Sequence, residues 1–394
     1  MHVGISSPVT IQEFLSYLDE ESQYKANGII GLKAPAVDIM IHSFLKNGHK
    51  ISIYTLTTEV KSRVVLKGEN IKIYINPLRA NGKLKALSFF KREANYIFES
   101  IKLEPNLPDI IHAHWTYEYS KGVLKFKDKI PVIITVRDWA PKILKLNLNY
   151  YRLARFMMDF NTFKTSNITF LANSLYIKEK VKNRWGLDIV SIPNAISDEF
   201  IISDLRINKE RRFIVSVSNN ISKAKNIEKL LKAFKKNEHI LNNIQLNLVG
   251  KQFYEYVPKV RIWREMGLLK NVNLIGEVDH KKLIDEYDKA VIIVHPSLEE
   301  SFGNTIIEAM SRGVPVIGGK FSGAVPHILD YGKVGILCDV SSEDEIATSL
   351  CDLLNNQTLM DELALKGIDT VKINYSEDAI YNQTLEFYQK LIKQ

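Results

Sequence analysis

Short apolar runs alternate with amphipathic helical stretches along the chain, and this pattern constrains the fold more than any other feature of the sequence. In the first half, the runs that read as strands are 2–7, 50–56, 109–114, 131–136, 168–173 and 189–193. In the second half they are 212–218, 244–250, 271–276, 290–297, 314–319 and 335–340. Helical periodicity lies between them, most clearly at 35–49, 226–236, 280–290 and 304–313. This alternation is typical of parallel sheets covered by helices.

The chain is long enough for two domains, and its charge divides in the same way. Its 394 residues exceed what one hydrophobic core usually serves. Residues 1–195 hold 28 Lys and Arg against 17 Asp and Glu, whereas residues 196–394 hold 25 against 28. The change falls near 192–205, where Pro, Asn and Asp indicate a loop. We predict an α/β protein with two doubly wound domains, at 1–195 and 196–374, that face a cleft.

Composition excludes several classes of protein. With 45% hydrophobic and 25% charged residues, the chain has the make-up of an ordinary globular protein. No run approaches the roughly 18–20 apolar residues of a membrane span, and the start MHVGISSP lacks the pattern of a secretory signal. Cys338 and Cys351 have neither metal-ligand spacing nor the density of a disulfide scaffold. We therefore expect a cytoplasmic protein.

Two stretches of the first half, 82–102 and 141–158, interleave Lys and Arg with aromatic and aliphatic residues. Basic amphipathic segments of this kind can lie on an anionic membrane surface. They can equally be solvated helices that pack an apolar side inward. Nucleic-acid binding is a third explanation of the charge, but no zinc-finger or ribonucleoprotein motif supports it.

The segment EESFGNTIIEAM (299–310) carries the clearest signal of a site. Ligands of open parallel sheets bind beyond the carboxyl ends of strands, and this segment follows the run 290–297. Gly303 allows close approach to the backbone, Asn304 can cap the helix that follows, and the first amides of that helix can hold a phosphate. Glu300 and Glu308 suit hydroxyl donors, because an ionised carboxylate only accepts hydrogen bonds. A sugar nucleotide offers both kinds of group, although Glu308 alone could simply stabilise the helix dipole.

At these residues the chain resembles a known family. ESFGNTIIEAMSRGVPVI (300–317) is similar to the Glu-x7-Glu signature of retaining glycosyltransferases with the GT-B fold, particularly glycosyltransferase family 4. The flanking blocks 271–297 and 318–340 resemble that family too, as do PDIIHAHW and PVIITVRDW in the first half. The resemblance implies that residues 375–394 form a helix that returns to the first domain.

The resemblance also implies roles for individual residues. Glu308 would bind the ribose hydroxyls, while Glu300 and the backbone of Phe302 and Gly303 would contact the transferred sugar and the diphosphate. Lys225 matches the family's diphosphate-binding lysine, and His114 matches a histidine that faces the donor sugar. Further donor contacts are implied at the capping residue and at two glycines of the loop 25–37, namely Asn304, Gly28 and Gly31. That loop lacks the G-x-G-x-x-G spacing of nicotinamide enzymes.

Several positions on the donor side depart from the family pattern. Asn219 and Asn220 stand where Gly-Arg is common, so that Lys223 would have to replace the missing cation. Arg137 takes the place of a usual His, and Asn194 is followed by Ala instead of Gly. We keep all five positions as candidate donor-binding residues.

Together these observations predict a metal-independent, retaining hexosyltransferase. It would move a sugar from a nucleotide-diphosphate sugar to a saccharide or lipid-linked saccharide, in bacterial surface polysaccharide synthesis. His114, Lys225 and Glu300 would be the catalytic residues. No Asp-x-Asp triplet occurs, so we expect no metal, and the nucleotide sugar is a co-substrate instead of a resident cofactor. The protein would act in the cytoplasm, with peripheral contact to the inner face of the membrane. A sugar-nucleotide epimerase and a catalytically inert GT-B partner subunit are the alternatives.

Overall fold

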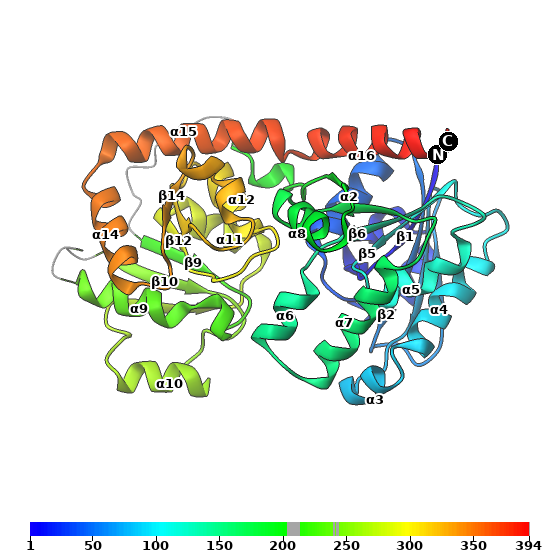
Figure 1. Cartoon of the computed structure of the whole chain (residues 1–394), viewed down its shortest axis with the longest axis horizontal. Coiled ribbons are helices and arrows are strands. Elements are labelled where there is room, and N and C mark those ends of the chain that lie inside the picture. Colours follow the sequence, from blue (N-terminus) through cyan, green and yellow to red (C-terminus); the bar gives the residue numbers. More distant parts are fainter. Residues whose placement is uncertain (203–212, 239–240, 242–243, 394) are drawn as a thin grey trace. The chain divides into compact units, whose positions relative to one another are not determined.

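The computed structural model describes residues 1–202, 213–238, 241 and 244–393 (Figure 1). The chain forms two compact units, one made of Met1–Ala195 with Glu377–Gln394 and the other of Ile196–Ser376. Each unit is built around a sheet whose strands alternate with helices along the chain. The predicted fold class, two Rossmann-like α/β domains, is confirmed. Of the expected junction loop at 192–205, residues 203–205 lie outside the described residues.

The first unit contains a sheet in the order β3-β4-β2-β1-β5-β6-β7-β8. Its strands are β1 (His2–Ser6), β2 (Lys50–Thr57), β3 (Val64–Lys67), β4 (Ile71–Pro77), β5 (Ile110–His114), β6 (Val132–Val136), β7 (Thr169–Ala172) and β8 (Val190–Ser191). All neighbours are parallel except β3 and β4, which pair antiparallel. The strand order reverses between β1 and β5, which is where doubly wound sheets bind ligands.

Helices of the first unit lie between these strands. They are α1 (Glu20–Lys25), α2 (Pro35–Lys46), α3 (Gly82–Leu87), α4 (Lys91–Lys102), α5 (Glu118–Val123), α6 (Ala140–Leu146), α7 (Tyr150–Phe163), α8 (Leu175–Trp185) and α16 (Glu377–Ile392), with short 3-10 turns at Ile11–Tyr17 and Leu124–Phe126. The expected helix at 35–49 is α2. It begins with Pro35, whose missing N–H costs nothing in a first turn, and it buries Val37, Ile41 and Phe44.

The second unit contains an all-parallel sheet in the order β11-β10-β9-β12-β13-β14. Its strands are β9 (Phe213–Val217), β10 (Gln245–Val249), β11 (Val272–Gly276), β12 (Ala290–His295), β13 (Val316–Gly319) and β14 (Ile336–Cys338). Its helices are α9 (Ile227–Lys236), α10 (Pro258–Glu265), α11 (His280–Asp288), α12 (Asn304–Ser311), α13 (Val325–Ile328), α14 (Glu343–Leu354) and α15 (Gln357–Asn374), with 3-10 turns at Asp198–Phe200, Lys223–Lys225 and Asp330–Gly332. The order reverses between β9 and β12.

The expected strands all form, with ends that differ by at most two residues. The strand at 189–193 shrinks to β8, and the run 212–218 starts at Phe213 because residue 212 lies outside the described residues. Strands β3 and β4 were missed. Both are rich in β-branched residues, but β4 is interrupted by polar positions, and the antiparallel β3 breaks the alternation with helices on which the prediction relied.

Each basic amphipathic stretch forms two helices instead of one. In 82–102, α3 and α4 are separated by Phe89 and Phe90, which both have positive φ. In 141–158, α6 and α7 are separated by exposed residues 147–149. The inward-packing interpretation is right for α4, whose Ile97 and Ile101 are fully buried. It fails for the exposed apolar residues of α3, α6 and α7, described below.

The last helix, α16, belongs to the first unit and closes its core. Tyr388 is fully buried there, and its hydroxyl lies 2.5 Å from His112 Nδ1 on β5. His112 Nε2 lies 2.6 Å from Thr135 Oγ1 on β6. Burial, and then the charge of Arg137, lowers the pKa of His112 to about 3, so its ring is neutral at neutral pH. The helix thus holds the strand that ends in His114.

We expect Tyr388→Phe to destabilise the first unit. The substitution leaves a buried ring nitrogen of His112 without its partner, which typically costs about 1–3 kcal/mol. Urea unfolding measures the loss. Tyr381→Phe on the same helix is the matched control, because its hydroxyl bonds the half-buried His49 at 2.9 Å. Equal effects of the two substitutions would contradict this account of His112.

Candidate functional site

In the second unit, the loops that follow β9 and β12 bring Lys225 and Glu300 together. Lys225 Nζ donates to Glu300 Oε1 at 2.5 Å. His295, the last residue of β12, has its Nε2 3.1 Å from the same oxygen. Thr305 Oγ1, in the first turn of α12, lies 3.2 Å from His295 Nδ1. Two of the three predicted catalytic residues therefore lie in one hydrogen-bonded cluster, at the reversal of strand order.

The charge state of Glu300 follows from these contacts. Burial alone would raise the pKa of its carboxyl group. The hydrogen bond from His295 and the charge of Lys225 outweigh burial and hold that pKa well below its usual range. Glu300 is therefore an ionised carboxylate throughout the physiological pH range, and its negative charge is compensated within the site.

Backbone contacts fix the position of Lys225. Asn226 has a positive φ of 56°, and its side-chain amide donates to the carbonyl groups of Pro296 and Val340 at 3.1 and 2.7 Å. The N–H of Leu298 donates to Ala224 O at 2.8 Å. The turn that carries Lys225 is thus tied to the loop that carries Glu300.

The glycine turn before α12 differs from the expectation in one detail. Asn304 was predicted to cap this helix, but Gly303 occupies the cap position with a φ of 115°, and Asn304 is the first helical residue. Gly303 contributes no capping side chain to the first turn, and its carbonyl accepts from the N–H of Ile306 at 3.0 Å. Phe302 packs its ring inward against Tyr375, so that only its backbone faces the turn.

Glu300 is held close to a second glycine. Gly323 has a φ of +62°, and a Cβ atom there would lie 2.1 Å from the carbonyl oxygen of Glu300. Glu300 O accepts from the N–H of Ala324 at 2.9 Å. The block 318–340, noted only for its resemblance, therefore positions the backbone of the candidate catalytic carboxylate.

Glu308 lies one turn into α12 and differs in charge from Glu300. Its Oε2 accepts from the hydroxyl of the fully buried Tyr287 at 2.7 Å. Burial raises the pKa of Glu308 to about 7, although the Tyr287 hydrogen bond opposes that rise. We expected an ionised Glu308 that only accepts hydrogen bonds. The neutral form is instead substantially populated at neutral pH, so Glu308 can also donate one.

The residues after β9 lie at the edge of this cluster. Asn220 Oδ1 accepts from the N–H of Ser222 at 3.0 Å, and its carbonyl accepts from Ser218 Oγ at 2.7 Å. Its side chain thus stabilises the turn itself. Asn219 and Lys223 are exposed. The hydrogen bonds that Glu300 makes with Lys225 and His295 involve none of these three predicted donor-binding residues.

In the first unit, three other predicted residues meet at the carboxyl ends of β5 and β6. Arg137 Nε donates to His114 Nδ1 at 3.0 Å, and Arg137 Nη1 donates to Asn194 Oδ1 at 2.7 Å. His114 and Asn194 are buried, and Arg137 is half-buried. Burial lowers the pKa of Arg137 to about 10, and burial followed by the charges of His112 and Arg137 keeps the pKa of His114 well below its usual range.

We expected Gly28 and Gly31, in the loop 25–37 of the first unit, to allow close approach of the donor. Both Gly28 and Gly31 have positive φ, and a Cβ atom on Gly28 would have nothing within 4 Å. At Gly31, however, a Cβ would lie 2.4 Å from Val9 O, so the close approach is made by the chain itself. The N–H groups of Ile30 and Gly31 donate to Glu59 Oε2 at 3.0 and 2.9 Å. The packing of this loop thus accounts for a glycine at position 31, and a donor contact there stays a prediction.

Sequence reasoning missed His295, Thr305, Tyr287 and Glu59. His295 lies near the end of the predicted strand 290–297, five residues before Glu300, and this position could have identified it. Thr305 lies inside the predicted motif. Tyr287 and Glu59 meet their partners only through the fold. Among the residues that the structure describes, no three His, Cys, Asp or Glu side chains gather as a metal site.

Models of two protein families match the chain. Residues 37–200 match the family described as Glycosyltransferase Family 4, and residues 197–369 match the family described as Glycosyl transferases group 1. The two matches together extend over both units, and the second includes the whole Lys225–Glu300 cluster.

Curated relatives point the same way. The chain is 22% identical over 300 residues to the N-acetyl-alpha-D-glucosaminyl L-malate synthase of Bacillus anthracis, covering 72% of this chain and 75% of the relative. It is 24% identical over 253 residues to the capsular polysaccharide biosynthesis glycosyltransferase CapM of Staphylococcus aureus, covering 56% and 66%. It is 23% identical over 290 residues to the phosphatidyl-myo-inositol mannosyltransferase of Mycobacterium leprae, covering 73% and 71%.

Solved structures share the fold over the whole chain. A sucrose-phosphate synthase from Thermosynechococcus elongatus aligns with a TM-score of 0.76 at 17% identity, covering 100% of this chain and 99% of that one. The HepE protein of Anabaena in complex with UDP aligns with a TM-score of 0.71 at 16% identity, covering 99% and 100%. At these identities the likeness concerns the fold alone.

The raised pKa of Glu308 predicts a pH dependence of stability. The folded state holds this proton more tightly than the unfolded state. The contribution of Glu308 to the free energy of unfolding is therefore greatest at low pH and falls as pH rises from the unfolded pKa of 4.5 towards about 7. Glu308→Gln should remove on the order of 2 kcal/mol of that fall. Urea unfolding at several pH values measures it.

Two features make this test specific. Asp38 and Asp159, whose pKa values burial also raises to about 7, are present in both proteins, so the difference isolates Glu308. Glu362→Gln on the exposed side of α15 is the control and should leave the slope unchanged. An unchanged slope in Glu308→Gln would show that this carboxyl is ionised in the fold.

Proposed function

Because this chain belongs to glycosyltransferase family 4, we propose that it is a retaining enzyme that transfers a hexose from a nucleotide-diphosphate sugar to a saccharide or lipid-linked saccharide. The observation that carries the proposal is the contact of Glu300 with both Lys225 and His295, at the carboxyl ends of β9 and β12. The relative that acts in capsular polysaccharide biosynthesis supports a role in bacterial surface polysaccharide synthesis.

The donor would lie across the glycine turn before α12. The amides at the start of α12 would hold the diphosphate, since the cap residue Gly303 offers no competing side chain. Glu300, always ionised, would accept hydrogen bonds from hydroxyl groups of the transferred sugar. Glu308 would bind the ribose, where a carboxyl with a pKa of about 7 can either accept or donate.

In the transfer step, the bond between the anomeric carbon and the diphosphate oxygen breaks as the acceptor oxygen attacks from the same face. The proton of the acceptor hydroxyl passes to the departing phosphate oxygen. Negative charge grows on that phosphate, and Lys225 would stabilise it as a fixed cation beside it. In this proposal backbone dipoles and Lys225 do the neutralising, with neither a metal ion nor a resident cofactor.

We expect Lys225→Met to lower kcat/KM for sugar transfer by about 10²–10³-fold, the usual cost of removing one preorganised charge-stabilising group. Nucleotide release with a panel of sugar nucleotides and acceptors measures the rate. Lys229→Met is the matched control, because that lysine pairs with Glu343 at 3.1 Å on α14.

The same assay separates the alternatives. Isomerised donor in mixtures without acceptor would identify an epimerase. Failure of every nucleotide sugar to bind, measured by thermal shift, would favour an inert partner subunit and contradict the proposed transfer. Transfer that survives in Lys225→Met would remove the role assigned to that lysine.

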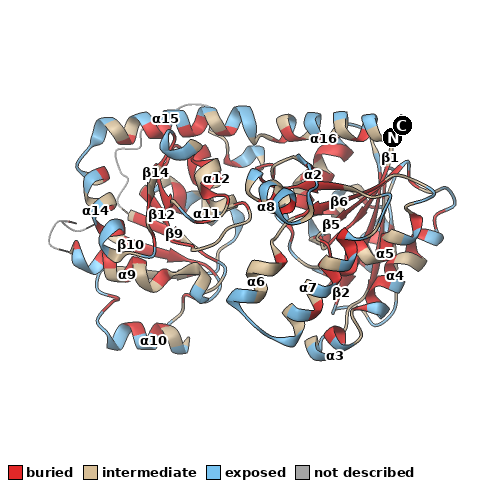
Figure 2. Cartoon of the chain, viewed as in Figure 1, coloured by how far each residue is buried: buried red, intermediate tan, exposed pale blue. Residues whose placement is uncertain are grey.

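The position of the acceptor is suggested by a surface of the first unit. In the part of the chain that the structure describes, no helix combines the length and apolarity needed to cross a membrane. Yet α3, α6 and α7, which contact one another through α7, expose a group of large apolar side chains. These are Leu84, Leu87, Leu146, Leu148, Tyr150, Leu153 and Met157. We call this group the apolar surface, and Figure 2 shows the exposed loop between α6 and α7.

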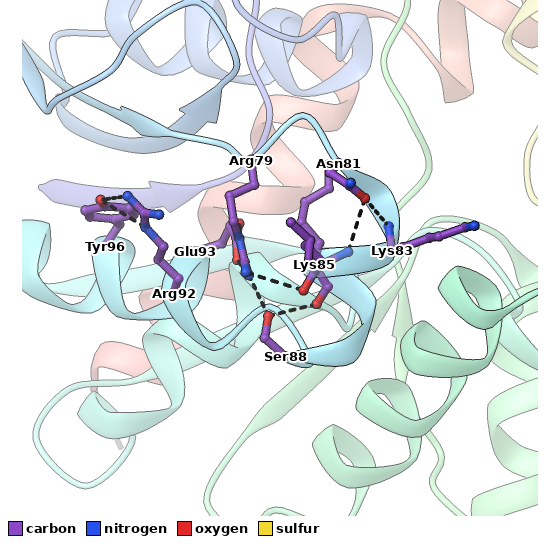
Figure 3. Close-up of polar contacts among 9 residues, drawn as sticks. Arg79, Asn81, Lys83, Lys85, Ser88, Arg92, Glu93 and Tyr96 are labelled. Carbon is purple, nitrogen blue, oxygen red and sulfur yellow. Dashed lines mark hydrogen bonds and ion pairs between the residues drawn. The ribbon is translucent and has the colours of Figure 1, made fainter.

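The charges around the apolar surface are of one sign. Segments 82–92 and 140–158 contain no acidic residue, and they expose Lys83, Lys91, Arg92 and Lys145. Figure 3 shows how the base of α3 is fixed: Arg79 lies between Glu93 and Ser88, bonding them at 2.8 and 2.5 Å, while Lys83 extends away from this pair. Apolar side chains surrounded by unopposed cations match an anionic lipid surface. We infer a cytoplasmic protein that docks peripherally there.

We expect the protein to co-sediment with vesicles that contain anionic phosphatidylglycerol and to stay in solution with neutral phosphatidylcholine vesicles. Leu87→Ser combined with Leu148→Ser should reduce binding by about 100-fold or more, since each fully transferred leucine contributes roughly 1.5–3 kcal/mol and about 1.4 kcal/mol is a factor of ten. Leu365→Ser, at an exposed leucine of α15, is the control. Equal sedimentation with both kinds of vesicle would contradict the proposed docking.

A further inference from the structure

Arg137 carries a charge that none of the residues described by the structure neutralises. It follows β6 directly and is half-buried, yet no ion pair joins it to any described residue. Its two side-chain hydrogen bonds go to neutral groups, His114 Nδ1 and Asn194 Oδ1. Burying a cation beside neutral partners alone is costly, and folded proteins normally compensate it with an anion.

The nearby carboxylate is committed elsewhere. Asp138, the next residue, accepts from Tyr117 OH at 2.7 Å. Burial raises the pKa of Asp138, and the arginines that oppose this rise are Arg155 and Arg152. Two further polar neighbours are neutral: His112 is occupied by Tyr388 and Thr135, and Asn173 Nδ2 donates to Arg137 O at 3.4 Å. The fold thus places Arg137 beside two histidines and two asparagines, none of which supplies negative charge.

The guanidinium group retains unused donors in a fixed orientation. Of its N–H groups, Nε and Nη1 are engaged, which holds the plane of the group, while Nη2 has no acceptor among the described residues. The group also lies over the ring of Trp115, 5.7 Å from its centroid. A planar group held at one edge and open at the other is suited to a carboxylate or phosphate.

The same hydrogen bond fixes the proton of His114. Arg137 Nε can only donate, so Nδ1 of His114 must accept, and the proton of the neutral ring therefore lies on Nε2. His114 is fully buried, and its Nε2 has no protein partner among the described residues. Two unsatisfied donors, on Arg137 and His114, therefore lie at the carboxyl ends of adjacent strands.

We propose that the open edge of Arg137 binds a carboxylate or phosphate group carried by one of the two sugar substrates, so that this enzyme prefers an anionic sugar to its neutral counterpart. The His114 Nε2–H would then be presented to an oxygen of the same sugar. This inference rests on the proposed transfer reaction, because only that reaction makes the bound sugar a substrate. The anion site itself is a property of the first unit.

The test follows the guanidinium signal of Arg137 directly. The full chain is labelled with ¹⁵N-arginine, and the Nε signal of Arg137 is assigned by its loss in Arg137→Lys. Inorganic phosphate and acetate are then titrated. We expect a saturable shift of the Arg137 signal at concentrations where the signal of Arg92, an exposed arginine bonded to Tyr96, does not yet move.

Two matched pairs of sugars identify the source of the anion. The donor arm compares UDP-glucose with UDP-glucuronic acid, and the acceptor arm compares glucose with glucose 6-phosphate. We expect the anionic member of one pair to displace acetate from Arg137 at least about tenfold better than its neutral partner, a difference of about 1.4 kcal/mol. Arg137→Gln should abolish that preference in a binding assay, and an unchanged far-UV circular dichroism spectrum shows that this variant is folded.

The outcomes are distinct from those of the transfer assay. Anions that leave the Arg137 signal unmoved, or pairs whose two members behave alike in both arms, overturn the proposal. A preference that persists in Arg137→Gln overturns it as well. If the anion site is found but no nucleotide sugar supports transfer, the proposed function fails and the site stands.

Discussion

Parallel pairing of β9 with β12, and of β5 with β6, is the constraint on which the candidate sites depend. Strands that run in one direction deliver their carboxyl ends to one edge of a sheet, and neighbouring loops must then meet there. Lys225 and Glu300 are 75 positions apart in the chain, yet this pairing puts Nζ and Oε1 2.5 Å apart. His114 and Arg137 meet for the same reason at β5 and β6. In each unit the sheet fixes the positions of the loops, and residues at the strand ends and in these loops form the candidate site.

The two glutamates of one motif illustrate how neighbours decide charge. Glu300 has a cation and an imidazole on one oxygen, so burial does not prevent its ionisation. Glu308 has only a phenol, and burial prevails. Glu300, before α12, is thus a permanent anion, whereas Glu308, one turn into α12, is a carboxyl group that titrates near neutrality. Arg137 shows the opposite case, a half-buried cation whose hydrogen-bond partners among the described residues are all neutral.

Much of this could be predicted from the sequence, because hydrophobic periodicity reports burial and strand ends report position. Most of the strands and the segment after β12 that carries Glu300 follow from those signals, whereas Lys225, His114 and Arg137 were identified by the resemblance to the family. Tyr287 could not be found, since its contact with Glu308 depends on how α11 packs beside α12. Nor could the capping role of Gly303 or the contact of Gly31 with Val9, which are set by local dihedral angles. The antiparallel β3 escaped because it departs from the repeating pattern.

The place of α16 has a consequence for how the molecule is made. Tyr388 completes the core of the first unit and supports His112, but it is translated after the entire second unit. A nascent chain therefore emerges from the ribosome with its first domain unfinished, and its amino-terminal sheet must wait for the codons of α16 while the second domain folds. A chain whose synthesis stops before α16 lacks Tyr388, so the support of His112 forms only after the second unit has been translated.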